Sequence, residues 1–525
     1  MMTKPPRDEV SIESGSAAAR SAEATERWIL VVAILGSSMA FIDGTVVNVA
    51  LPAIQSGLGG TVADMQWVVE AYALLLSALI LTGGASGDVF GRKRMFLLGV
   101  SVFVTASVAC GLAADIRELE IARSVQGLGA AFLVPGSLSI ISASFSESKR
   151  GRAIGTWSGF TSITTAAGPV VGGWLIQHAS WRWAFFLNVP IAIAVIALAF
   201  RWVPESKAEK HEEIDWAGAL LATVGLTGLT YGFIESSSRS WTSVAVWGAL
   251  LAGGTCLVCF WYFEERASSP MVPFDLFRSR NFSGGNLLTF FLYAALGIFF
   301  FLFPLNLIQV QHYSATGTGA AALPFILLMF LLSRWSGGLV ARFGARRPLI
   351  IGPLIAGIGF ICFALPSEGG SYWRTFFPGF VVLGLGMAVT VAPLTTAVMD
   401  AASRNLAGTA SGINNAVARV GGLLAIAVLG TVMLGLFSHS LNEHLGTLGL
   451  PDHVARAVQS SEIKLAATTV PQVLRADTAA KLSTLIDSAF VFGFRLIMLL
   501  CAGLSLVSSG FAWSMMREND AASSR

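Results

Sequence analysis

A succession of long apolar runs constrains the fold of this chain more than any other feature. A helix needs about 20 mostly apolar residues to cross the hydrocarbon layer of a membrane. Fourteen runs meet that need, near residues 28–50, 65–86, 95–114, 119–145, 153–178, 183–203, 215–234, 244–263, 284–308, 319–341, 348–366, 373–399, 406–437 and 486–514. Only 12% of the 525 residues are charged, against about 25% in soluble domains. This composition excludes a soluble enzyme, a disordered chain and a coiled coil, so we predict an all-α polytopic membrane protein with fourteen transmembrane helices.

Basic residues predict the direction of the spans. If the first tail is cytoplasmic, the short inner loops hold sixteen lysines and arginines and the short outer loops hold four. Such an excess marks the cytoplasmic side, so we expect both termini in the cytoplasm and the chain in the inner membrane. Residues 1–27 have no signal-peptide layout and are predicted to be a disordered cytoplasmic tail, as is 517–525. Residues 438–485 are predicted to form an extracytoplasmic loop of unassigned role.

An internal repeat divides the spans. The pattern Gly84-x6-Gly91 before Arg92 recurs 253 residues later as Gly337-x6-Gly344 before Arg346, and Gly155-Thr156 recurs at the same offset as Gly408-Thr409. We therefore predict two parallel six-helix bundles, 28–203 and 284–516, with two inserted helices and their flanking loops in 204–283. Parallel six-span repeats are the architecture of major-facilitator transporters.

Ordered motifs then carry a resemblance to one family, the 14-span drug:proton antiporters of the EmrB/QacA type. These motifs are Asp43-Gly44-Thr45 through Leu51-Pro52; Gly84-x3-Asp88-x2-Gly91-Arg92-Lys93; Arg123-x2-Gln126-Gly127; Gly168-Pro169-x2-Gly172-Gly173; and Trp181-Arg182-Trp183 through Asn188-Val189-Pro190. The resemblance implies a major-facilitator fold and proton-coupled efflux of drugs or toxic compounds by alternating access. The implied partners are a small amphiphilic substrate, protons and the lipid bilayer.

Three ionisable residues are candidates for proton coupling. An ionisable group deep in a membrane is costly and is by default a functional candidate. At 1.5 Å per residue, Asp43 lies roughly 22 Å from the inner end of the first span. Glu70 lies roughly 21 Å from Gly84, which is near the inner end of the second span. Arg123 lies near the outer start of the fourth span. We predict that these two acids and one base, at similar depth, form a proton site with a counter-charge. Alternatively, Asp43 and Asn48 only form hydrogen bonds to neighbouring helices.

Two further motifs each allow two interpretations. The loop Asp88–Arg94 anchors the chain at the cytoplasmic face, or, by resemblance, Asp88 and Arg92 lock the cytoplasmic ends of the helices in the outward-open state. Gly84 and Gly91 would let the second span approach its neighbour closely. Around Gly168-Pro169, the fifth span is either a bending interface or a site of close helix packing.

Three arginines in the second half and the type of transport each allow more than one interpretation. Arg334, Arg419 and Arg495 lie in second-half spans, where they either reach toward the membrane surface or line an anion-tolerant cavity. A proton symporter for a metabolite and a lipid exporter are alternatives with the same fold. The sequence has no metal-ligand cluster, phosphate loop or nucleophile–base set, so an enzyme is not expected. We expect no cofactor, no nucleic-acid partner and a monomer.

Overall fold

The computed structural model of the chain is helical and describes residues 8–207, 214–239, 241–267, 270–402, 407–448, 450–468, 470–471 and 474–516. Its first half comprises α1 (Asp8–Leu58), α2 (Val62–Phe90), α3 (Arg92–Leu112), α4 (Ile116–Ser144), α5 (Glu147–His178), α6 (Trp183–Phe186), α7 (Asn188–Trp202), α8 (Trp216–Arg239) and α9 (Val244–Glu264). The second half comprises α10 (Arg280–Leu305), α11 (Ala315–Ala321), α12 (Leu323–Gly337), α13 (Leu339–Phe343), α14 (Arg346–Ala364), α15 (Tyr372–Thr375), α16 (Phe377–Asp400), α17 (Ala407–Leu445), α18 (Asp452–Ser461) and α19 (Ala476–Met515). Short turns η1 (Phe274–Arg278), η2 (Asn306–Val310), η4 (Gly446–Leu448) and η5 (Glu462–Ala467) connect some of them.

The helices agree with the predicted spans. Thirteen described helices or helix pairs are long and apolar enough to cross a membrane. Each coincides with one of the fourteen predicted runs. The remaining run, 153–178, lies in α5, a helix of 32 residues whose middle is rich in glycine, serine and threonine. The described part of the chain is therefore an all-α membrane protein, as predicted.

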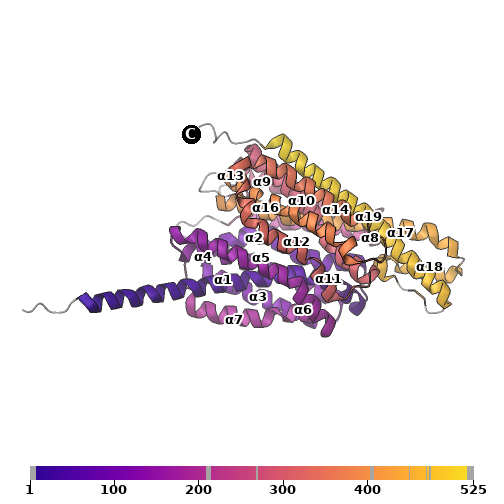
Figure 1. Cartoon of the computed structure of the whole chain (residues 1–525), viewed down its shortest axis with the longest axis horizontal. Helices are drawn as coiled ribbons and strands as arrows, with labels where there is room; N and C mark the ends of the chain where they lie inside the picture. The colour runs from indigo at the N-terminus through magenta and orange to yellow at the C-terminus, as the bar shows by residue number, and fades with distance from the viewer. Residues whose placement is uncertain are drawn as a thin grey trace, which may run out of the picture.

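The helices of the two halves form two groups, which Figure 1 shows one above the other. Glycines bring the helices of each group together in an equivalent way. A methyl group at Gly127 of α4 would lie 2.4 Å from the carbonyl oxygen of Tyr72 in α2, and one at Gly129 would lie 2.5 Å from the backbone of α3. In α16, a methyl group at Gly384 would lie 3.1 Å from the backbone of α12, and one at Gly386 would lie 2.4 Å from that of α14. Both central helices thus use a Gly-x-Gly pair to contact the two preceding spans, as the sequence repeat predicts.

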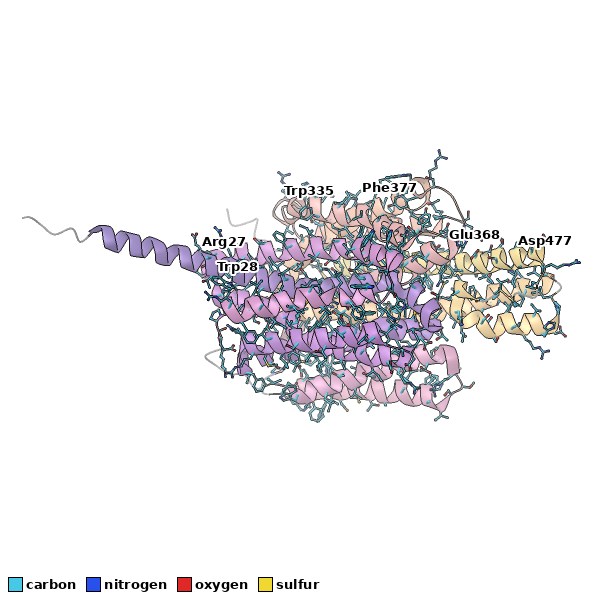
Figure 2. The ribbon with its side chains drawn as sticks, turned by 90° about the horizontal axis from the view of Figure 1, so that it is seen from below. Arg27, Trp28, Trp335, Glu368, Phe377 and Asp477 are labelled. Carbon is cyan, nitrogen blue, oxygen red and sulfur yellow. The ribbon has the colours of Figure 1, made fainter. Side chains whose placement is uncertain are left out.

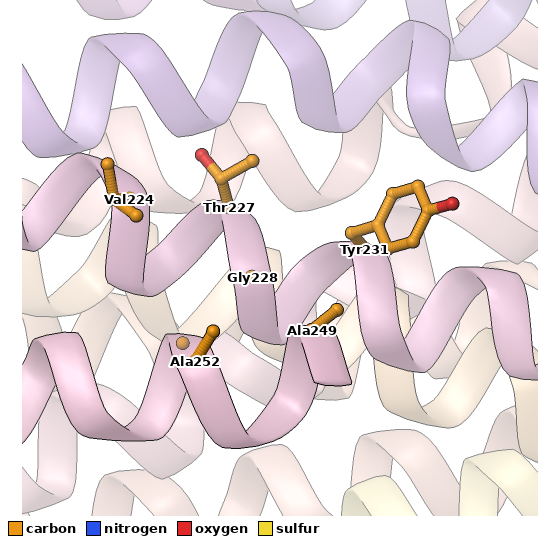
Figure 3. Close-up of a pocket in the computed structure, with 7 residues that line it drawn as sticks. Val224, Thr227, Gly228, Tyr231, Ala249 and Ala252 are labelled. Atoms are coloured by element: carbon orange, nitrogen blue, oxygen red, sulfur yellow. The ribbon is translucent and has the colours of Figure 1, made fainter. Parts of the chain in front are cut away.

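The inserted helices α8 and α9 pack tightly on each other, because Gly228 and Gly253 allow their backbones to approach. Helix α8 also lies against α2 and α17. A crevice between α8 and α9 is lined by Val224, Thr227, Gly228, Tyr231, Ala249, Ala252 and Gly253 (Figure 3). None of these lining residues is acidic or basic, so the crevice offers no charged group to a ligand.

The two groups of helices share a large hydrophobic core at one end, and a smaller cluster joins α2 to α17 further along. Residues 46–54 of α1 belong to the same buried cluster as α10 and the 425–445 part of α17. The opposite half of α1, residues 29–40, belongs to a separate cluster built mainly from α2, α3, α4 and α7. The groups are therefore joined where α1 ends and α2 begins, which we call the junction end.

Two predictions about the ends of the chain differ from the structure. Helix α1 begins at Asp8, so residues 8–27 are helical and not an irregular tail; alanine, glutamate and arginine, all good helix formers, are abundant there. The predicted loop 438–485 is mostly helical, because α17 and α19 extend beyond the bundle and α18 packs against α17. This extension, with Asp477 near its tip, lies at the opposite end from Arg27 and Trp28 (Figure 2). The tail 517–525 and part of the predicted loop before α8 lie outside the described residues.

Candidate functional site

Asp43 is the centre of a buried polar network inside the first group of helices. Its carboxylate is fully buried and accepts hydrogen bonds from Arg123 Nη1 at 2.5 Å, Gln126 Nε2 at 2.8 Å and Asn188 Nδ2 at 3.3 Å. These three donors come from α4 and α7, while Asp43 lies on α1. Burial removes the screening of water, so the attraction between the two charges is strong at this distance.

Arg123 is held by groups other than Asp43 as well. Its Nε donates to the carbonyl oxygen of Val68 at 3.0 Å, and its Nη1 also donates to Gln126 Oε1 at 2.7 Å. The guanidinium lies 4.3 Å from the ring centroid of Tyr72 and 5.9 Å from that of Phe185. The arginine would therefore keep hydrogen-bond acceptors and aromatic contacts if Asp43 lost its charge.

A second layer fixes the donor Asn188. Its Nδ2 also donates to Ser107 Oγ at 3.0 Å, and Ser107 in turn donates to the carbonyl oxygen of Phe185 at 2.9 Å. Asn188 begins α7 immediately after the short helix α6. Sequence reasoning singled out Asn188 only as part of a motif and gave Ser107 and Tyr72 no role. The sequence signal that could have identified these residues is a polar side chain within an otherwise apolar run.

Glu70 does not join this network, although the sequence predicted it at a similar depth. Its side chain is fully buried, and both carboxyl oxygens have no hydrogen-bond partner within the described residues. Trp67 and Leu74, one turn to either side on α2, pack against α8 and α17. Thr230 of α8, between residues of the same two clusters, is likewise fully buried with an unpartnered hydroxyl. Glu70 thus lies at the contact of α2, α8 and α17.

The loop motif between α2 and α3 is tied to the end of α7. Asp88 pairs with Arg92 of its own loop at 2.7 Å, so these two residues do not bridge separate groups of helices in this conformation. Glu205 instead accepts from the backbone amides of Lys93 at 3.1 Å and Arg94 at 3.2 Å. Lys93 Nζ donates to the carbonyl oxygen of Phe200 at 3.3 Å.

The glycines of this motif have different surroundings. Gly91 has a φ of +112°, which side-chain-bearing residues rarely adopt. A methyl group at Gly84 would make only an ordinary contact, with Pro135 at 3.5 Å, whereas one at Gly83 would lie 2.0 Å from the carbonyl oxygen of Ala131. The close approach predicted at Gly84 therefore occurs one residue earlier.

The antiporter motif of α5 forms close contacts on two sides. Methyl groups at Gly168 and Gly172 would lie 2.3 Å and 2.5 Å from the side chains of Thr45 and Val46 in α1. One at Gly173 would lie 2.3 Å from the carbonyl oxygen of Ala315 in α11. Pro169 lies within the helix between them. Close packing, one of the two interpretations of this motif, is what the structure contains at these glycines.

Hydrogen bonds cross between the two groups of helices at the junction end. Gln309 Nε2 donates to Gln55 Oε1 at 2.8 Å, and Gln55 Nε2 donates to the carbonyl oxygen of Lys464 at 3.2 Å. Gln66 Nε2 donates to the carbonyl oxygen of Ile426 at 2.6 Å. The molecule is therefore closed at this end.

The second-half arginines have different environments. Arg495 donates to the carbonyl oxygens of Leu365 and Pro366 after the end of α14. Arg419 of α17 is partly buried. The side chain of Arg334 lies outside the described part of the structure.

Comparison with known proteins places the chain in a family. Residues 33–426 match the family described as Major Facilitator Superfamily. The multidrug resistance protein Stp of Mycobacterium tuberculosis is 35% identical over 83% of this chain and 80% of its own length. The tetracenomycin C resistance and export protein of Streptomyces glaucescens is 32% identical over 92% of this chain and 91% of its own.

Solved structures have the same fold at low identity. A bacterial homolog to the human lysosomal transporter Spinster, in its inward-facing and unoccupied conformation, aligns with a TM-score of 0.64 and 17% identity over 94% of this chain and 99% of that one. A D-xylose–proton symporter aligns with a TM-score of 0.58 and 13% identity, over 94% and 98% of the two chains. The sequence match, the relatives and the shared fold together establish that this chain belongs to the major facilitator superfamily.

Proposed function

We propose that the protein is a proton-coupled exporter of small amphiphilic compounds, driven by the proton gradient alone and working by alternating access in the bacterial cell membrane. The observation that carries this proposal is the fully buried Asp43 carboxylate, 2.5 Å from the guanidinium of Arg123. Two relatives, a multidrug resistance protein and a tetracenomycin C resistance and export protein, support the export direction.

The exchange at Asp43 couples protons to the conformational change. Ionised Asp43 is stabilised by Arg123, Gln126 and Asn188. A proton arriving on Asp43 removes its negative charge, and Arg123 remains bound to Val68 and Gln126. The two protonation states then favour different arrangements of the two bundles, which is a shift of population. Each proton supplies about 2.3 kcal/mol per 100 mV and about 1.4 kcal/mol per pH unit.

The junction end is proposed to face the outside, since the excess of basic residues predicts cytoplasmic termini. The conformation described here is then inward-facing, with the outer end closed by Gln55, Gln66 and Gly173. The lock between Asp88 and Arg92 and other cytoplasmic helix ends would form only after the inner end closes. Glu70 is proposed as a second protonatable carboxyl, separate from Asp43, at the contact of α2, α8 and α17.

Everted membrane vesicles test this function. Addition of an amphiphilic dye should dissipate an imposed proton gradient in vesicles that contain the wild-type protein and leave it intact with D43N at equal abundance. Dye that moves together with protons would support the metabolite-symporter alternative. Movement of labelled phospholipid without dye transport would support the lipid-exporter alternative.

A further inference from the structure

Arg419 lies within a membrane span, and no group in the described part of the structure neutralises its charge. The charge of Arg123 is matched by Asp43. Arg495 donates hydrogen bonds to the carbonyl oxygens of Leu365 and Pro366, the nearest at 3.1 Å. Within the described residues, Arg419 makes no hydrogen bond or ion pair. Arg419 lies about 18 Å along α17 at 1.5 Å per residue, where a free charge is costly.

The surroundings of Arg419 place it at the boundary between the two bundles. One face of α17 contacts α2, since Leu423 packs with Leu74 and Ala78. Closer to the start of α17, a methyl group at Gly412 would meet the side chain of Leu81 at 3.0 Å. Asn415, one turn before Arg419, is exposed. Arg419 lies between these two contacts and is itself partly exposed, so its side chain is accessible at the bundle boundary.

Part of α1, in the other bundle, is exposed as well. Tyr72 of α2 donates to the carbonyl oxygen of Ala40 in α1 at 3.2 Å. One turn further along α1, Gly44 is exposed, and a methyl group added there would meet nothing within 4 Å. An unpaired guanidinium and an uncovered glycine thus occur on opposite bundles, each on a helix that packs against α2.

We propose that Arg419 is a substrate-binding residue that recognises the anionic group of an amphiphilic substrate, whose apolar body lies along the open face of α1 at Gly44. A guanidinium presents a planar set of donors that matches a carboxylate in two parallel hydrogen bonds. This binding supplies the counter-charge that the protein itself does not provide. The inference rests on the proposed export function and names the substrate class for it.

Three pyrene probes with the same apolar body test this assignment: pyrenebutyrate (anionic), pyrenebutanamide (neutral) and pyrenebutyl-trimethylammonium (cationic). Binding to the purified full-length protein in phosphatidylcholine nanodiscs is followed by fluorescence. We expect the wild type to bind pyrenebutyrate about tenfold more tightly than the cationic probe, the gain typical of a charge-assisted hydrogen bond. R419Q should lose this preference and keep its affinity for the amide, and R419K should keep part of it. R495Q, a matched loss of charge, should bind like the wild type.

Equal affinities of the wild type for the three probes would overturn the proposal. This test uses the wild-type protein alone and so does not depend on whether the variants fold. A preference for pyrenebutyrate that persists in R419Q would overturn it too. Displacement of pyrenebutyrate by phosphatidylglycerol, with no pyrenebutyrate transport, would assign Arg419 to a lipid headgroup instead. Failure of export itself is distinguishable: the wild type would then move none of the three probes in exchange for protons in everted vesicles.

Discussion

Gly173 of α5 and Ala315 of α11 meet across the boundary between the two bundles, so closely that a methyl group on the glycine would lie 2.3 Å from the alanine carbonyl oxygen. A reciprocal contact lies alongside it, because a methyl group at Gly319 would be 2.0 Å from the carbonyl oxygen of Pro169. Backbone approach of this kind requires glycine. Helix α5 therefore contacts α1 within its own bundle and α11 in the other, through glycines of one motif.

G173A should prevent closure of the junction end. The added methyl group must displace α5 from the backbone of α11, so the closed arrangement becomes less populated and transport falls. Distances between spin labels at the ends of α5 and α11 should lengthen. G155A is the matched control, because a methyl group at Gly155 of the same helix meets nothing within 4 Å. Unchanged label distances in G173A would contradict this role for the contact.

R123M should strongly destabilise the fold, because it leaves the fully buried Asp43 without its counter-charge. Loss of one partner of a buried ion pair costs about 3–5 kcal/mol, which should appear as a large fall in the thermal unfolding temperature of the purified protein. The double variant D43L/R123M should recover most of that loss but not proton coupling. K481Q removes an exposed pair with Asp477 and should cost at most about 1 kcal/mol. A fall as small in R123M as in K481Q would show that the pair does not hold the bundle together.

G91A should destabilise the loop between α2 and α3. Alanine strongly disfavours the φ of +112° at this position, and backbone strain of this kind costs about 1–3 kcal/mol. The added methyl group would also lie 2.8 Å from the Glu205 carboxylate that holds the loop. G87A is the control: Gly87 lies within α2 with its nearest contact at 3.8 Å, and alanine is favoured there by about 1 kcal/mol. The unfolding temperature should fall in G91A and not in G87A; the same change in both would argue against the strained turn.

The sequence predicted the spans and the repeat because both depend on local signals, namely apolar length and glycine spacing. It also predicted Asp43 and Arg123 at similar depths, and the structure brings them into contact. Depth does not specify the face of a helix, however. Successive residues are about 100° apart around a helix, so Glu70 and Tyr72 of α2 point to different neighbours, and the close glycine contact falls at Gly83 and not at Gly84.

Other features depend on contacts between segments distant in the sequence. The donor Asn188 reaches Asp43 only because α6 and α7 fold back on α3 and α1. Glu205 binds the amides of Lys93 and Arg94, although its position in the sequence gives no sign of this contact. The helical extension of α17 to α19 likewise depends on packing that hydropathy does not report.

Proton release on substrate binding tests the exchange at Asp43 most directly. If a proton on Asp43 disfavours substrate, binding of substrate must expel that proton to the same degree. Addition of neutral pyrenebutanamide to the wild-type protein in weakly buffered solution should therefore release protons, as a pH-sensitive dye reports. D43N should bind the probe and release fewer protons, the difference reaching at most one proton for each probe bound. Equal proton release by D43N and the wild type, at equal binding, would contradict the account.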